Sequence, residues 1–280
     1  MSKAAESKIA EDNSSLSPLE LYLSQFSTCP TVSYEDILDS HRGKIVYIET
    51  DRFIARSLYS SKKTYDEYSE DIQQLYQVTF ADPIVMEKFA TGTTRTPEQF
   101  QNTVNLQSMR WEKGYPFAAF IVTDKETGAV VGYEVIGNSG IDNTGELAYL
   151  FNKHCHRSNT IQNVGYENVG ALSLVYGESL FKAKKKINQT YNEERQEFES
   201  GSEFIKLQAT TRDDNPASKR ILEKIGCKYI KDDFKFGHNR HVFEKEYTET
   251  PVVQELDYTS NLGLMGEESV AHSSEYGQII

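Results

Sequence analysis

The sequence predicts an α/β protein in which one mixed, mostly antiparallel sheet carries helices on both faces. Three strand-like segments follow one another in the middle of the chain, and strands joined by short turns pair antiparallel. Strand-like and helix-like segments then alternate, which is the order of parallel crossover connections. We assign all of these segments to a single domain over residues 44–250, with a polar N-terminal extension before it and an acidic tail after it.

The extension, residues 1–43, carries one short helix. Ser17 can cap this helix, because Pro18 stands in its first turn and Glu20 completes a capping box. The apolar residues of the segment fall along one stripe: Leu16, Leu19, Leu23 and Phe26. We expect the helix to dock on the main domain rather than to bind a partner.

The first half of the domain predicts one strand and two amphipathic helices. The strand is RFIARSLY, residues 52–59. The helices are TYDEYSEDIQQLYQVTF, residues 64–80, and TPEQFQNTVNLQSMRWEKG, residues 96–114. Thr96 caps the second helix, and a proline and a glutamate follow it in the opening turn.

The middle of the domain predicts three strands. The first two, FAAFIVTD (117–124) and AVVGYEVIGN (129–138), flank the turn KETG, in which Gly128 can take a positive φ. The third is GELAYLFN, residues 145–152.

A long helix over residues 164–186 follows, and it leads into a charged segment near residues 182–203. Because this segment is longer than a typical connection, we interpret it as a solvated extension, with a substrate-contacting flap as the alternative. The strand EFIKLQATT, a helix from Pro216 and two closing strands complete the domain. The tail, residues 251–280, has acidic residues and no Lys or Arg, so we expect it to be flexible.

Composition excludes two classes of partner. A net charge of −12 argues against nucleic-acid binding through a broad basic face. No apolar run is long enough to span a membrane, and the polar start lacks the apolar core of a secretory signal, so we expect a cytoplasmic protein. The acidic charge suits a cationic partner such as an amine, a polyamine or a basic peptide.

The cysteines and histidines predict neither a disulfide framework nor a metal site. Cys29, Cys155 and Cys227 are an odd, scattered set, which favours unpaired thiols. His154 and His156 flank Cys155 in the motif KHCH, but two or three ligands in one exposed loop are too few for a closed site. We therefore expect no bound metal and assign this loop a structural or substrate-rim role.

The corner NPASKRILEKIG, residues 215–226, is a distinctive stretch. Asn215 can cap a helix whose first residue is Pro216, where the missing N–H costs nothing. Gly226 provides a left-handed stop. The expected buried stripe is Ala217, Ile221, Leu222 and Ile225. Helix formation alone explains the cap, the proline and the glycine when each is taken singly.

A second stretch, IQNVGYENVGAL (161–172), passes from loop to helix directly after a strand. Gly165 and Gly170 are spaced as they would be if the backbone approached a ligand near the helix N-terminus. There, unpaired N–H groups and the helix dipole favour a phosphate. Packing of the helix against the sheet explains Gly170 equally well.

Together these stretches resemble the GCN5-related N-acetyltransferase (GNAT) superfamily, and within it the branch that acetylates ribosomal-protein N-termini and small amines. The matching motifs are TDRFIARSL, GAVVGYEVIGN, GELAYLF, QNVGYE and NPASKRILEKIG, of which the last is the most specific. Their order and spacing agree over residues 49–247 apart from the charged segment. One position departs from the family, because Glu167 stands where the acyl-CoA loop has Gly or Ala. A carboxylate there is expected to crowd and repel a pyrophosphate unless it turns outward.

The resemblance implies acetyl-CoA as co-substrate. In the family the fourth core strand bonds the pantetheine arm through its backbone, which makes Leu150 and Phe151 the candidates for these contacts. The pyrophosphate would lie on amides of the loop and of the helix start: Gln162, Asn163, Val164, Gly165, Tyr166 and Asn168. Asn215 and Ser218 would face the coenzyme from the neighbouring helix.

The resemblance also implies direct attack of a neutral amine on the thioester. An alkylamine, with a pKa near ~10.4, must lose a proton, so a nearby carboxylate is useful. Glu146 is the first candidate for this base and Glu134 the second, although Glu146 fits a solvated strand-end carboxylate equally well. Many family members have a Tyr that protonates the thiolate where this chain has Leu222. Ser218 or Tyr149 could substitute for it.

Two functions stay open on the sequence. The leading interpretation is an N-acetyltransferase whose acceptor is an amine-bearing small molecule or protein: a peptide N-terminus, a lysine, a polyamine or an aminoglycoside. The alternative is a GNAT-fold protein that binds acyl-CoA weakly and acts through protein contacts, which Glu167 and the missing Tyr favour. The tail sequence GEESVAHSSEYGQII also resembles export signals read by bacterial type IV secretion systems, with an ordinary disordered tail as the alternative.

Overall fold

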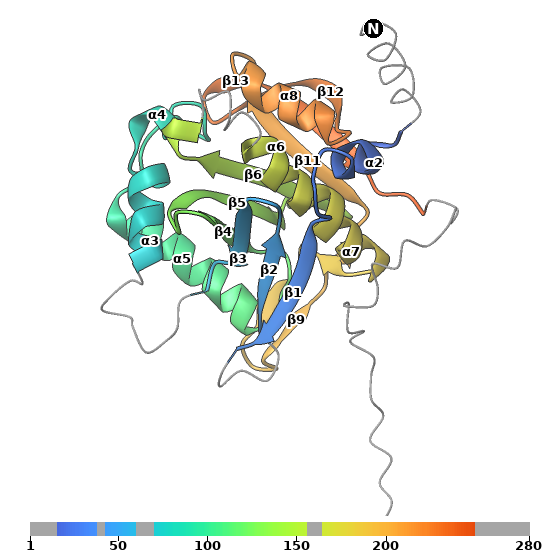
Figure 1. Ribbon diagram of the computed structural model, residues 1–280. Helices are drawn as coiled ribbons and strands as arrows, with labels where there is room; N and C mark the ends of the chain where they lie inside the picture. The colour runs from blue at the N-terminus through green and yellow to red at the C-terminus, as the bar shows by residue number, and fades with distance from the viewer. Residues whose placement is uncertain (1–15, 38–42, 60–69, 156–163, 250–280) are drawn as a thin grey trace, which may run out of the picture. The chain divides into compact units, whose positions relative to one another are not determined.

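The computed structural model describes residues 16–37, 43–59, 70–155 and 164–249. These residues form a nine-stranded sheet with the order β1-β2-β3-β4-β5-β6-β11-β13-β12 (Figure 1). The strands are β1 Thr31–Asp36, β2 Lys44–Glu49, β3 Phe53–Ser57, β4 Ala119–Asp124, β5 Val130–Asn138, β6 Thr144–Phe151, β11 Lys206–Arg212, β12 Lys228–Lys235 and β13 His238–Glu246. Neighbouring strands pair antiparallel except β6 and β11, which are parallel. The predicted mixed, mostly antiparallel sheet is confirmed.

Helices cover both faces of this sheet. Successive residues of a strand point to opposite faces, and Phe120 and Ile121 on β4 belong to two separate hydrophobic clusters. The cluster with Ile121 contains buried residues of α3 (Glu70–Leu75), the π-helix η3 (Tyr76–Phe80), α4 (Pro83–Met86) and α5 (Pro97–Glu112). The cluster with Phe120 contains those of α6 (Val164–Gly170), the π-helix η5 (Ala171–Tyr176), α7 (Gly177–Lys182) and α8 (Pro216–Lys224). We call the two sides the α5 face and the α6 face.

The N-terminal helix α2 (Pro18–Leu23) docks on α6. Its predicted capping box at Ser17 is confirmed. The docking residue is Tyr22, which is 0% exposed and packs on Gly170, where an added Cβ would lie 2.2 Å from the tyrosine ring. The Tyr22 hydroxyl also donates to the carbonyl oxygen of Glu167 at 2.6 Å. The predicted stripe plays a smaller part, because its members are only half-buried or exposed: Leu16, Leu19, Leu23 and Phe26.

Two segments contain strands that the sequence did not predict. The first is β1, which extends the sheet from within the polar extension. The second is the charged segment, which forms two small ladders: β7 (Lys186–Ile187) with β10 (Ser202–Glu203), and β8 (Thr190–Asn192) with β9 (Glu197–Glu199). Ile187 is fully buried, and the Phe198 ring stacks on Tyr115 with centroids 4.5 Å apart. These contacts pack the segment on the domain, although most of its side chains are exposed or half-buried, so the interpretation as a solvated extension is corrected in part.

Among the helices of the described ranges, none has the length and apolar character that crossing a bilayer requires. Residues 251–280, with the export motif, lie outside the described residues. The export expectation therefore stays a prediction.

Candidate functional site

The parallel strands β6 and β11 pair only over their first halves. Their register joins Thr144 to Lys206 and ends at Glu146 and Gln208, although both strands are described in full and continue further. Along the rest of its length β6 pairs with β5, and β11 pairs with β13. From Leu147 onward, the two strands therefore part and present backbone edges that are not paired with each other.

The backbone of β6 alternates between its two neighbours. The amide of Asn152 donates to the carbonyl of Val131, next to β5, at 2.8 Å. Because successive residues of a strand direct their N–H and C=O groups to alternate sides, Leu150 faces β5, whereas Tyr149 and Phe151 face β11. The backbone groups of Leu150, expected to contact the coenzyme, are therefore directed to β5 and not to the space between β6 and β11.

The predicted corner lies beside the parted strands. Asn215 caps α8 by accepting a hydrogen bond from the amide of Ser218 at 3.2 Å. The hydroxyls of Ser218 and Tyr149 lie 2.8 Å apart, and this contact joins α8 to β6. Burial raises the pKa of the Tyr149 phenol, so it stays protonated at neutral pH. Leu222, where the family has a Tyr, is buried in the core, whereas Ala217 of the predicted stripe is exposed.

Gly165 and Gly170 make room for protein side chains. A Cβ on Gly165 would come within 2.6 Å of the Ile221 Cδ1 atom on α8. Gly170 admits Tyr22 of α2, not the sheet. Close packing of helices therefore explains both positions without a ligand.

The start of α6 is continuous with η5 and α7 up to Lys182. The first N–H groups of such a helix, from Val164 onward, have no partner within the helix. The Asn168 side chain turns back to the helix and donates to the carbonyl of Val164 at 2.8 Å. The Tyr166 ring is buried edge-on against Tyr22, with centroids 5.5 Å apart. Two of the expected contact residues, Gln162 and Asn163, lie outside the described residues.

Glu167 turns away from the parted strands. Its carboxylate accepts hydrogen bonds from the hydroxyl of Thr50 at 2.6 Å and from the amide of Arg52 at 3.2 Å. Both donors lie in the turn between β2 and β3, and β3, β4 and β5 separate this turn from β6. A buried polar group costs free energy when it lacks partners, so these two hydrogen bonds favour this orientation. The expected clash with a pyrophosphate therefore does not follow from this side chain.

The two candidate bases lie on opposite faces of the sheet. Glu146 is the last residue of β6 to pair with β11, and its carboxylate lies 3.4 Å from the amine of Lys235. Glu134 is directly opposite Tyr149 in the register of β5 and β6, and its side chain is 0% exposed on the α6 face. Within the described chain neither of its oxygens has a hydrogen-bond partner. Burial raises the pKa of Glu134 to about 8.

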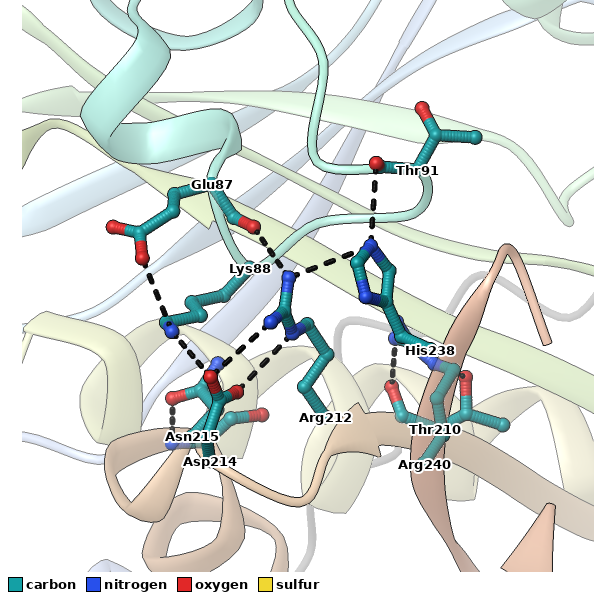
Figure 2. A network of polar contacts seen from close by, with 10 residues as sticks. Glu87, Lys88, Thr91, Thr210, Arg212, Asp214, Asn215, His238 and Arg240 are labelled. Atoms are coloured by element: carbon teal, nitrogen blue, oxygen red, sulfur yellow. Dashed lines mark hydrogen bonds and ion pairs between the residues drawn. The ribbon is translucent and has the colours of Figure 1, made fainter. Parts of the chain in front are cut away.

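A polar network that the sequence did not predict ties the carboxyl end of β11 to the segment after α4 (Figure 2). The amine of Lys88 lies 2.5 Å from a carboxylate oxygen of Asp214. Arg212 donates to the carbonyl of Glu87 at 3.1 Å and to Asp214. Figure 2 also shows His238 between Arg212 and Thr91. No local signal could reveal these contacts, because Lys88 and Asp214 are 126 residues apart.

The KHCH motif is described only in part. Lys153–Cys155 forms a short 3-10 helix, η4, and the amine of Lys153 lies 2.9 Å from the carboxylate of Asp82. His156 lies outside the described residues. Among the residues that are described, no three His, Cys, Asp or Glu side chains form a group that could hold a metal ion.

The comparisons with known proteins agree with this fold. The family model "Acetyltransferase (GNAT) domain" matches residues 67–228. A GNAT-family acetyltransferase from Bacillus anthracis is 19% identical, with a TM-score of 0.50 over 71% of this chain and 98% of its own. A ribosomal-protein-S5-alanine acetyltransferase from Vibrio fischeri is 14% identical, with a TM-score of 0.50 over 73% of this chain and 99% of its own. At these identities the likeness is one of fold. No curated protein matches the sequence. Since the family model covers more than half of the residues, the chain belongs to the GNAT acetyltransferase family.

Proposed function

We propose that this protein transfers the acetyl group of acetyl-CoA to a primary amine, by direct attack of the amine while both substrates are bound. Acetyl transfer is the general activity of the family to which the chain belongs. The observation that carries the proposal is the end of the β6–β11 pairing at Glu146. An extended ligand can bond to a strand edge from which the neighbouring strand has parted, as a strand would.

The residues beside this edge fit an acyl-CoA arm. Tyr149 and Phe151 direct backbone groups toward the space that the pantetheine would occupy. The amides from Val164 onward, with those of Gln162 and Asn163, would hold the pyrophosphate at a helix N-terminus. Asn215 and Ser218 stand at the neighbouring helix start. Glu167 is bonded to the turn between β2 and β3, so its side chain is directed away from this space.

Two groups of this chain would move the protons. Bound acetyl-CoA supplies a thioester carbonyl that a neutral amine can attack. Glu146, at the point where the strands part, accepts the proton of the amine that arrives from the α5 face. Ser218, bonded to Tyr149, donates a proton to the leaving sulfur on the other side. Glu134 is unsuited to the base role, because it is enclosed on the α6 face with no access to an incoming amine.

The acceptor is a peptide N-terminus, a lysine or a small polyamine. The matched fold from Vibrio fischeri is named for a ribosomal-protein alanine, which supports a peptide N-terminus as the first acceptor to test. The rival function, a GNAT-fold protein without catalysis, drew its support from Glu167 and the missing Tyr. The orientation of Glu167 argues against the first of these, and the Ser218–Tyr149 pair offers a proton donor in place of the missing Tyr.

Calorimetry with acetyl-CoA tests the proposal directly. We expect saturable binding, followed by free-thiol release when a panel of amines is added. Glu146→Gln is expected to lower kcat/KM by roughly 10²- to 10⁴-fold while acetyl-CoA affinity is unchanged. Glu203→Gln, an exposed carboxylate on β10, is the matched control and should have no effect. Absence of binding at millimolar acetyl-CoA would reject the transferase and leave the non-catalytic function.

A further inference from the structure

Lys235 reaches across the sheet to the candidate base. Its amine lies 3.4 Å from Glu146 Oε1, and the two side chains are 40% and 34% exposed. Lys235 ends β12, which is separated from β6 by β11 and β13. The register places Glu146 level with Gln208 and Glu244, whereas the partner of Lys235 is His238, six residues further along β13. In a flat sheet three strand spacings amount to roughly 14 Å and six residues to roughly 20 Å, so the end of the β12–β13 hairpin must bend back over the sheet to make this contact.

The tip of this hairpin is held in its bent position. Its turn contains Phe236 and Gly237 with φ of 59° and 80°. The Lys235 amine lies 5.1 Å from the centroid of the Phe236 ring, and the Arg240 guanidinium carbon lies 5.6 Å from the same centroid. Arg240 in turn donates to the hydroxyl and the carbonyl of Thr210 on β11, at 3.0 and 2.9 Å (Figure 2). The hairpin is therefore anchored to β11, and Lys235 is directed toward Glu146.

This placement puts an amine of the chain itself where an acceptor amine has to be. Glu146 is the last residue of β6 that pairs with β11, so its carboxylate marks the point at which these two strands part. If the proposed function holds, the acetyl group is delivered at that point and Glu146 takes the proton of the attacking amine. We propose that Lys235 is itself acetylated by this protein, in an intramolecular reaction.

The reaction is balanced with the substrates of the proposed function. The Lys235 nitrogen, once neutral, attacks the thioester carbonyl, so an N–C bond forms and the C–S bond breaks. The proton of the amine passes to Glu146 and then to solvent. Coenzyme A leaves as the thiol, after its sulfur takes a proton from Ser218, which regains one from water. The product is an amide at Lys235, which has lost its positive charge.

Proximity favours Lys235 over a free amine. A group held beside its reaction partner behaves as if it were present at a very high local concentration. The ion pair with Glu146 does not prevent the reaction, because a pair of two partly exposed side chains is weak and exchanges with solvent. Acetylation would also release Glu146 from its pairing with Lys235, which leaves the carboxylate free for an external acceptor.

Peptide mass spectrometry of the full chain after incubation with acetyl-CoA alone tests this proposal. We expect one acetyl group at Lys235, gained at least about tenfold faster than at Lys231, an exposed lysine on the same strand. The rate per molecule should not change with protein concentration. Lys235→Arg keeps the positive charge and should leave no acetylation at this position, whereas Lys231→Arg should leave acetylation of Lys235 unchanged. Glu146→Gln should slow the modification of Lys235 toward the rate at Lys231.

Three results would overturn the proposal while leaving acetyl transfer to other amines intact. The first is equal labelling of Lys235 and Lys231 in protein that binds acetyl-CoA by calorimetry. The second is labelling of Lys235 in the Glu146→Gln variant when wild-type protein is added, which would indicate reaction between molecules. The third is a rate that rises with protein concentration. Absence of acetyl-CoA binding would reject the proposed function as well, so the two failures are distinguishable.

Discussion

Replacing Glu134 by Gln is expected to remove a penalty on stability that grows with pH. Glu134 is fully buried on β5, and within the described residues neither carboxylate oxygen has a partner. Burial raises its pKa from 4.5 to about 8. The folded state therefore keeps this proton over a range in which the unfolded state releases it.

The magnitude follows from the two pKa values of Glu134. Below pH 4.5 both states are protonated, and the side chain carries no ionisation penalty. As the pH rises from 4.5 to about 8, only the unfolded state loses the proton, so the free energy of unfolding falls by about 1.4 kcal/mol per pH unit. Over this window the loss amounts to about 5 kcal/mol, and above pH 8 it is constant.

Urea unfolding of the wild type, Glu134→Gln and Glu134→Met between pH 5 and about 9 measures this effect. Each variant also differs from the wild type in packing, which shifts its free energy of unfolding by an amount that does not depend on pH. The readout is therefore the slope, against pH, of the difference in unfolding free energy between the variant and the wild type. We expect the free energy of unfolding of both variants, relative to the wild type, to rise by about 1.4 kcal/mol per pH unit up to pH 8. Above pH 8 we expect this difference to stay constant. A difference that does not change with pH would refute the reasoning, because it would mean that Glu134 titrates alike in both states.

Two further changes test the packing around α6. Glu167→Ala removes the acceptor of the Thr50 hydroxyl and the Arg52 amide, so we expect a loss of roughly 1–3 kcal/mol in thermal or urea unfolding. Acetyl-CoA affinity should stay nearly constant in calorimetry, and a marked tightening would mean that the carboxylate reaches the coenzyme. Gly170→Ala places a Cβ 2.2 Å from the Tyr22 ring, which should cost about 1–3 kcal/mol and expose α2 to limited proteolysis. In a protein that already carries Tyr22→Ala, the loss of stability caused by Gly170→Ala should be smaller. If the losses from the two substitutions simply added, the contact between Tyr22 and Gly170 would be contradicted.

Much of the fold could be predicted because the signals are local. The capping box at Ser17 and the caps at Thr96 and Asn215 each depend on residues three positions apart, and all three form as expected. The strand β1 was missed, because its residues are largely exposed and its alternation of polar and apolar side chains includes only two apolar residues, Val32 and Tyr34. The two ladders of the charged segment were missed because their strands are only two or three residues long.

The candidate site could be predicted only in outline. The motif NPASKRILEKIG gave the position of the cap and of Ser218, because a helix start is a local feature. The direction of the Glu167 side chain depends on Thr50, which is 117 residues away in the sequence, so spacing within the loop could not reveal it. The contact between Lys235 and Glu146 likewise joins residues 89 apart. It exists only because the β12–β13 hairpin bends over the sheet.

The sequence by itself determined most of the helices and of the strands of the main sheet, and therefore the family of folds, since periodicity and capping act over a few neighbouring residues. The tertiary structure alone decided where β6 and β11 part and which way Glu134, Glu146 and Glu167 point. A carboxylate takes its role from the donors, the burial and the charges around it. In this protein those surroundings come from strands and helices that are far apart in the chain.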